Sequence, residues 1–203
     1  MRTSRRSVVL LVGIAAMVIL AATIAIVATG SPNSDELRGV SEDDGGIPVD
    51  FSRPFANGTQ VDSVAAAKAY LPFSPAESSV AGRPVAVWLK SLETPPAEQA
   101  IASVFDTPPY GDFEIVQDQT DMTSAQLKEI ADGCDPAQGC QGEWKMVTLS
   151  DGTDALYIGG PTAHSVMWVT KGGRFNIVGH AESMPEEGLM KIANDVQSHA
   201  TGP

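Results

Sequence analysis

The sequence is poor in the side chains on which most catalytic and nucleic-acid-binding sites depend. Its 203 residues include two cysteines, three histidines and 13 Lys and Arg, against 25 Asp and Glu. Nucleic-acid binding needs clustered basic side chains, so a net charge of −12 argues against a nucleic-acid partner. A nucleophile elbow, a Ser-x-x-Lys motif, a His-Glu-x-x-His motif and a phosphate loop are also missing. We therefore expect no enzyme and no cofactor, with a hydrolase whose site forms only on folding as the enzymatic alternative.

Charge is absent altogether from residues 8–28, a run of Val, Leu, Ile and Ala. At about 1.5 Å per residue, a helix of this length spans the roughly 30 Å core of a bilayer. Arg2, Arg5 and Arg6 precede the run, and the next charges are acidic. The positive-inside rule then keeps residues 1–7 cytoplasmic. The sequence predicts a single-pass plasma-membrane protein with its C-terminal part outside the cytoplasm.

Other export signals are alternatives to this anchor. A cleaved signal peptide has a shorter apolar region and a better cleavage site than the one around Ala28. Ser4 to Val8 is similar to a twin-arginine signal, but the region that follows is unusually hydrophobic. No cysteine stands directly after the apolar run, which excludes a lipoprotein anchor. We expect an uncleaved anchor, with a cleaved export signal as the alternative.

Composition divides the rest of the chain in two. Residues 29–57 are rich in Ser, Pro, Asn, Asp and Gly without periodicity, which predicts a flexible tether. Residues 58–200 are expected to form one extracytoplasmic domain. Beyond residue 30 there are 25 acidic and 10 basic residues, a net charge of −15 that favours solubility and repels anionic lipid headgroups.

The two cysteines, Cys134 and Cys140, are close together in a Gly- and Pro-containing loop. Outside the cytoplasm such a pair predicts a structural disulfide. A redox site would favour Cys-x-x-Cys near a helix start, and zinc would need further ligands.

The first half of the domain contains one predicted helix and three predicted strands. Thr59 to Asp62 resembles a helix-capping start, and Pro72 would end that helix near Tyr70. Branched and aromatic residues predict strands over 85–90, 100–106 and 112–117.

The second half begins with a capping box, Thr123 to Gln126, which opens a short helix. Strands over 143–149 and 153–158 flank the turn signal Asp151-Gly152. A terminal hairpin turns at Gly172-Gly173, which predicts Thr170 opposite Phe175 and Trp168 opposite Ile177.

A terminal amphipathic helix should follow this hairpin, with Ser183 as its N-cap and Glu186 completing a capping box. Its apolar stripe should pack on the face that bears Trp168 and Phe175, and it comprises Leu189, Ile192, Ala193 and Val196. The predicted fold is α+β: a mostly antiparallel, curved sheet of about six or seven strands with two or three helices on one face, plus the N-terminal transmembrane helix.

His164 and His180 lie at the two ends of the terminal hairpin. Neighbouring imidazoles would form a pH-sensing or metal-binding pair. The alternative is two polar residues at strand ends near solvent, and we otherwise expect no metal site.

Four motifs carry a family resemblance: Leu71-Pro-Phe73, Val166-x-Trp168, Phe175-x-Ile177-x-Gly179 and Leu189-x-x-Ile192-Ala193. With the anchor and tether, they resemble a domain of unknown function in single-pass exported proteins of actinobacteria. The domain is also similar to one found on sporulation and anti-sigma-type membrane proteins of other Gram-positive bacteria. A looser likeness to lipoprotein carriers implies an apolar groove for acyl chains. These are packing motifs, so the resemblance assigns no functional residue.

We therefore expect a membrane-anchored binding or sensing module of the cell envelope, non-enzymatic, with a protein, peptide or lipid-like ligand. The alternative is an accessory subunit of a larger membrane complex. Ala21 and Ala25 would give its transmembrane helix a small-residue face for that association.

Overall fold

The computed structural model describes residues 50–134, 140, 142–171 and 173–200. The predicted anchor over 8–28 and most of the predicted tether lie outside these residues. Within the described ranges, no helix has the length and apolar character needed to cross a membrane.

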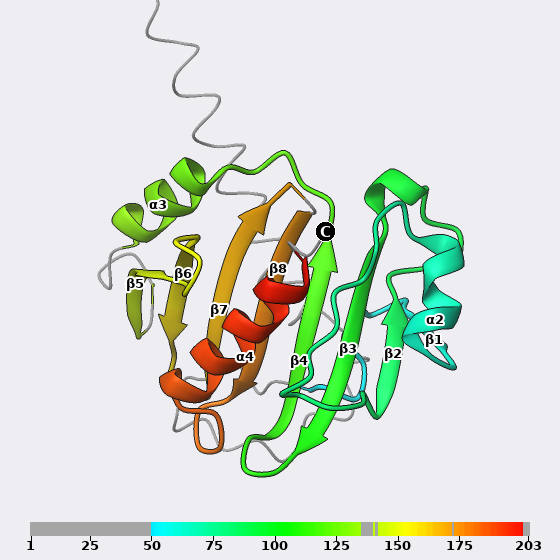
Figure 1. Ribbon diagram of the computed structural model, residues 1–203, viewed down its shortest axis with the longest axis horizontal. Helices are drawn as coiled ribbons and strands as arrows, with labels where there is room; N and C mark the ends of the chain where they lie inside the picture. The colour runs from blue at the N-terminus through cyan, green and yellow to red at the C-terminus, as the bar shows by residue number, and fades with distance from the viewer. Residues whose placement is uncertain (1–49, 135–139, 141, 172, 201–203) are drawn as a thin grey trace, which may run out of the picture.

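The domain is built on one eight-stranded antiparallel sheet, which confirms the α+β class (Figure 1). The strand order across the sheet is β1-β2-β3-β4-β8-β7-β6-β5. The sequence predicted six or seven strands, so this count was too low. The strands are β1 (Thr59–Val61), β2 (Ala86–Leu89), β3 (Ala100–Thr107), β4 (Gly111–Asp118), β5 (Glu143–Thr148), β6 (Asp154–Gly159), β7 (Ala163–Thr170) and β8 (Gly173–His180).

The additional strand, β1, occupies the start of the predicted first helix. Gln60 pairs with Trp88 of β2, so the backbone here is extended. The helix starts later because Ser63 is the actual N-cap and accepts a hydrogen bond from the Ala66 amide. The first helical segment is α2 (Val64–Ala67) followed by the 3₁₀ turn η1 (Lys68–Tyr70), and a second 3₁₀ turn is η2 (Pro96–Glu98).

The two longer helices lie on opposite faces of the sheet. α4 (Glu186–Ala200) packs on the face that carries Trp168 and Phe175, as predicted. α3 (Ser124–Gly133) packs through Leu127 against Met167 and Val169, whose side chains point to the other face. The sequence predicted two or three helices on one face; α2 and α4 share a face, and α3 departs from the prediction, although its predicted capping box is present.

The main core lies between α4 and the sheet. The predicted stripe of α4 is fully buried. Beneath it the rings of Trp168 and Phe175 stack with their centroids 5.1 Å apart. Trp168 Nε1 donates a hydrogen bond to Gln197 of α4 at 2.8 Å. Gln197 in turn donates to Asp151 in the β5–β6 turn, so helix and hairpin are joined by polar contacts as well as by packing.

The β7–β8 hairpin forms in a register two residues from the predicted one. Trp168 pairs with Phe175 and Thr170 with Gly173, so Gly173 belongs to the strand and not to the turn. It has a positive φ of 120°, and a Cβ there would lie 2.1 Å from the carbonyl oxygen of Asp118. Side chains alternate between the two faces of a strand, so a register shift of two residues leaves the same side chains on the buried face, as predicted.

α4 begins at Glu186 and not at Ser183, so the predicted N-cap was also wrong. Ser183 lies in a turn, where its amide and that of Met184 donate to the His180 carbonyl. Met184 is fully buried before the helix starts. Glu186 binds Lys145 Nζ at 2.9 Å instead of closing a capping box.

Residues 50–58, which we call the N-terminal strap, lie on the face opposite α4. Phe51 packs on Val104 and Val178, and Phe55 packs on Ala100 and Ala102. The predicted tether extended to residue 57, so its last part is folded onto the sheet.

Candidate functional site

An open groove of about 940 Å³ lies on the α4 face, between the start of α2 and the C-terminal end of α4. Its walls include residues 76–79 and 82–85 of the crossing segment (residues 72–85), which connects η1 to β2. In Figure 1 this segment runs as a long loop across the front of the sheet beside α4. Clefts of this size commonly hold small molecules.

The floor of the groove is made by side chains of three neighbouring strands. Val61 pairs with Val87, and Val87 pairs with Ser103, so antiparallel register brings all three to one face. Phe105 lies two residues beyond Ser103 on that face and is almost fully buried. The floor is apolar except for one hydroxyl.

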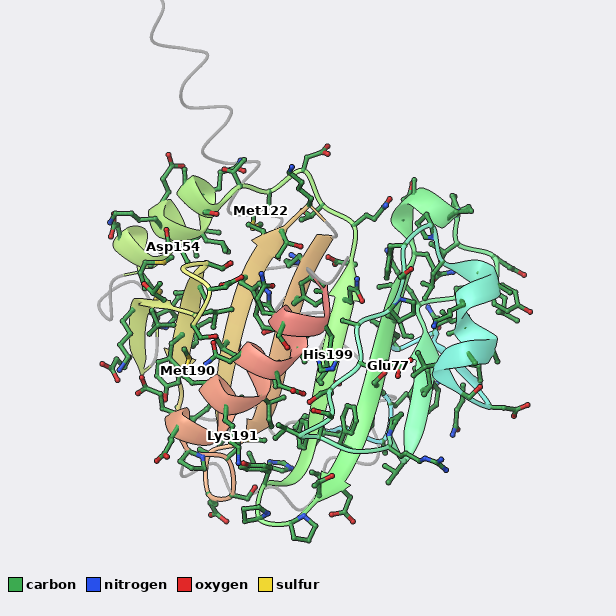
Figure 2. All side chains as sticks on the ribbon, viewed as in Figure 1. Glu77, Met122, Asp154, Met190, Lys191 and His199 are labelled. Carbon is green, nitrogen blue, oxygen red and sulfur yellow. A yellow bond between two sulfur atoms is a disulfide. The ribbon has the colours of Figure 1, made fainter. Side chains whose placement is uncertain are left out.

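The rim of the groove is polar and carries both signs of charge. Asp62 and Glu77 contribute carboxylates, and Arg83 contributes a guanidinium. His199 enters from the last turn of α4 and lines the same groove as Glu77, and both are labelled in Figure 2. Val85 adds an apolar side chain at the edge that is 64% exposed. A ligand here would meet an apolar base and charged or hydrogen-bonding groups along its sides.

Asp195 of α4 fixes the crossing segment over the sheet. Its carboxylate accepts hydrogen bonds from the hydroxyls of Ser78 and Ser79, at 2.7 and 2.8 Å. The Val80 amide donates to it at 3.1 Å. Asp195 therefore holds the middle of this wall of the groove.

Two further side chains hold the ends of this wall. Gln117 of β4 accepts from the Ala76 amide at 2.9 Å and donates to the Ser74 carbonyl at 3.3 Å. At the other end, Thr107 donates to the Ala81 carbonyl at 2.8 Å. Because strand and helix residues bind the segment along its length, we expect the groove to be largely preformed.

The electrostatics of Asp195 follow from these contacts. Partial burial raises the pKa of this carboxyl, but the hydrogen bonds from Ser78, Val80 and Ser79, with the nearby His199, outweigh burial. The pKa of Asp195 therefore lies below its ordinary value, and the group is ionised at neutral pH.

The Ser, His and Asp near the groove do not have the geometry of a catalytic triad. A triad uses one imidazole nitrogen toward the serine and the other toward the carboxylate. Here the same atom, His199 Nδ1, lies 2.8 Å from the Asp195 carbonyl oxygen and 3.4 Å from Ser198 Oγ. Ser78 and Ser79 bind the Asp195 carboxylate directly, without an intervening histidine. The arrangement supports a structural role for Asp195.

The structure places His164 and His180 on opposite faces of the sheet. His164 pairs with Gly179, and its Nδ1 lies 2.8 Å from the Met184 carbonyl oxygen on the α4 side. His180 pairs with Ala163, and its ring makes an edge contact with Phe51 of the strap. The two imidazoles do not form a joint site, and the described residues contain no cluster of three metal-ligating side chains.

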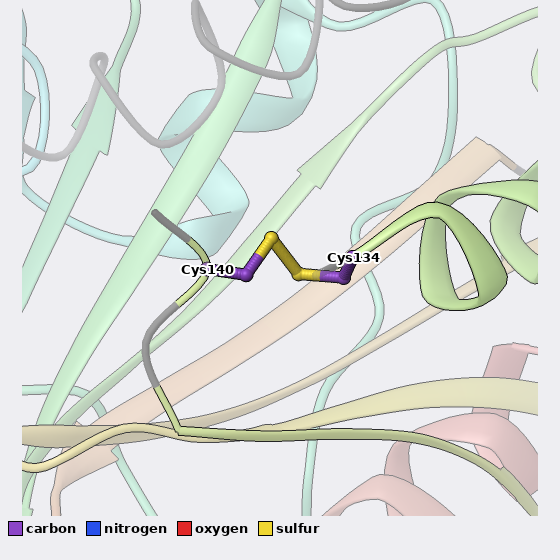
Figure 3. Close-up of a disulfide and its surroundings, with 2 residues drawn as sticks. All are labelled: Cys134 and Cys140. Atoms are coloured by element: carbon purple, nitrogen blue, oxygen red, sulfur yellow. A yellow bond between two sulfur atoms is a disulfide. The ribbon is translucent and has the colours of Figure 1, made fainter. Parts of the chain in front are cut away.

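Cys134 and Cys140 form the predicted disulfide, with Cα atoms 5.7 Å apart (Figure 3). Cys134 follows the end of α3, and Cys140 precedes β5. The bond therefore ties the helix to the strand that begins the second half of the sheet.

The residues that shape the groove were not found from the sequence. Asp195 had one usable signal, because an acidic residue near a helix C-terminus opposes the helix dipole unless it has partners. Ser103 and Gln117 had none, since each is a polar residue within an otherwise ordinary strand pattern.

Comparisons with protein-family models, with curated proteins and with solved structures gave no match to this chain.

Proposed function

We propose that this chain is a non-catalytic binding module of the cell envelope that holds a peptide segment in the groove beneath the crossing segment. The observation that carries the proposal is the groove itself: about 940 Å³, open to solvent, with an apolar floor and a charged rim. Sites of this size and mixed polarity orient ligands through a few polar groups above an apolar surface.

The rim favours a peptide over an acyl chain. An acyl chain offers no partner for Asp62, Glu77 or Arg83, and covering these groups without a partner would be unfavourable. A peptide brings backbone amides and carbonyls for the rim and side chains for the floor. Val85, exposed at the edge, provides apolar contact for such a side chain.

The location in the envelope is supported by the disulfide and by the sequence before the domain. Disulfides persist mainly outside the cytoplasm. Residues 8–28 would supply the anchor, and the likeness to exported actinobacterial proteins agrees with this location. The alternative role, an accessory subunit of a membrane complex, depends on residues 8–28, which lie outside the described residues.

The proposal is tested by placing a charge at the edge of the groove. Val85→Glu should weaken binding of peptides selected by the wild-type chain from a random-peptide array, by at least about tenfold. Leu92→Glu is the matched control, because Leu92 is also an exposed apolar residue but does not line the groove. Affinities would be measured by fluorescence anisotropy with the labelled peptides.

Two results would contradict the proposal. Equal peptide binding by wild type and Val85→Glu would place the peptide elsewhere on the molecule. Binding of a fluorescent fatty acid that Val85→Glu abolishes, with no peptide retained by the wild type, would replace the peptide by a lipid ligand.

A further inference from the structure

A buried carboxyl group lies on the face opposite the groove. Glu114 of β4 is 1% exposed, and the described residues provide no hydrogen-bond partner for its Oε1. Trp88 Nε1 of β2 is a second polar atom on this face for which the described part of the chain provides no hydrogen-bond partner. Buried polar groups are usually paired, so an unpaired carboxyl requires a reason.

The N-terminal strap covers this carboxyl group. Glu114 pairs directly with Val104 on one side and with Val178 on the other. Phe51 shares a hydrophobic cluster with both of these valines, from which we infer that the strap passes over Glu114. Trp88 contacts the clusters of Phe51 and of Phe55. Movement of the strap would therefore expose Glu114 to water.

The other described ionisable groups on this face form no ion pair or hydrogen bond with the Glu114 carboxyl group. The ionisable groups on the strap are Asp50 and Arg53. The neighbouring strands add Asp106 from β3, Asp112 from β4 and His180 from β8. Asp118, four residues along β4 from Glu114, is paired with Arg174 of β8. None of them is bonded to Glu114, and burial alone raises the pKa of Glu114 to about 7. His180 contacts Phe51 instead, with ring centroids 4.8 Å apart.

We propose that the N-terminal strap is a pH-responsive clasp, held on the sheet when Glu114 is protonated and released when Glu114 ionises. Release would hydrate the carboxylate and uncover the apolar surface around Val104, Val178 and Trp88. This device is independent of the groove, which lies on the other face.

The direction of the pH effect follows from proton linkage. With the strap closed the pKa of Glu114 is about 7, and with the strap open it returns toward the ordinary 4.5. Below about pH 4.5 both states are protonated, so closure carries no penalty. Between about pH 4.5 and pH 7 the equilibrium constant for strap opening rises with pH, and above about pH 7 this constant levels off. From pH 5.5 to pH 8 the opening equilibrium should rise roughly 30-fold.

Hydrogen exchange of the full-length chain tests the clasp. Exchange of amides in residues 50–58, corrected for intrinsic rates, should show the roughly 30-fold rise between pH 5.5 and 8 in the wild type. Glu114→Gln, a neutral isostere, should remove this rise and keep the strap protected at both values. His180→Gln should keep the rise, which separates Glu114 from the nearby histidine.

A second measurement does not depend on the Glu114 variant. The ¹³C carboxyl signal of Glu114 should titrate near pH 7 in the wild type and near its ordinary value in Phe51→Ala, where the covering ring is gone. The proposal is overturned if Glu114 of the wild type titrates near 4.5. It is also overturned if strap exchange in Glu114→Gln rises with pH as in the wild type.

Discussion

Asp195 shows how one residue can determine the shape of a surface far from it in sequence. It lies in the last turns of α4, where a negative charge opposes the helix dipole. Its three hydrogen bonds from residues 78–80 compensate for this position. The Asp195 carboxylate, which would destabilise an isolated helix, thus holds the crossing segment in place through these hydrogen bonds.

Replacing Asp195 with Asn should destabilise the protein by about 1–3 kcal/mol, because one charged acceptor that takes three hydrogen bonds is lost. Urea unfolding at pH 7 measures the difference. Glu187→Gln is the control, since Glu187 is exposed on the same helix, and its change should stay within about 0.5 kcal/mol.

The same variant gives a pH prediction. Because the pKa of Asp195 is lower in the folded state, the carboxylate stabilises the fold above its ordinary pKa of 3.8 and loses this effect as the pH falls. The stability difference between wild type and Asp195→Asn should therefore narrow below about pH 4. A difference that widens on acidification would assign the stabilisation to another group.

At the scale of the element, α4 is the main contributor to the core. Ile192 is fully buried at the centre of its stripe. Ile192→Ala should cost about 2–5 kcal/mol, and Ile192→Asp should cost more because it also buries a charge. Thermal or urea unfolding followed by circular dichroism measures both.

Lys191→Ala is the matched control for these variants. Lys191 is the preceding residue, is labelled in Figure 2, and is exposed. Its replacement should change stability by less than about 0.5 kcal/mol. Comparable losses at the two positions would mean that α4 contributes through helix formation and not through packing.

Elements with a strong local pattern could be predicted from the sequence. The stripe of α4 and the Asp151-Gly152 hairpin follow from side-chain periodicity and turn chemistry, which depend on neighbouring residues only. The exact register of the β7–β8 hairpin was missed because the close approach of Asp118 requires Gly173 in the strand, and that contact comes from β4.

Features decided by distant partners could not be predicted. Phe51 and Phe55 stand in a polar, Pro- and Gly-containing stretch, so composition alone indicated a tether. α3 has an apolar side, but whether that side meets one face of the sheet or the other depends on Met167 and Val169. The groove combines α2, three strands and α4, and no local pattern encodes that combination.

For the whole molecule, the disulfide provides local stabilisation without determining the fold. It closes a loop of about seven residues, for which chain entropy predicts roughly 2.4 kcal/mol. The double variant Cys134→Ser and Cys140→Ser should lose up to this amount in urea unfolding and keep the wild-type circular dichroism spectrum. The reduced wild type should match it; loss of the folded spectrum would show that the disulfide holds the two halves together.

The strand order has a consequence for synthesis and folding. β1 to β4 pair in sequence, and β5 to β8 do the same, so each half is a meander that can form from contacts nearby in the chain. The halves join only where β4 pairs with β8. Until residue 180 has emerged, the edge of β4 has no partner from the second half, and an unpaired edge can pair with another nascent copy. Truncated chains that stop before β8 should therefore associate with one another through β4.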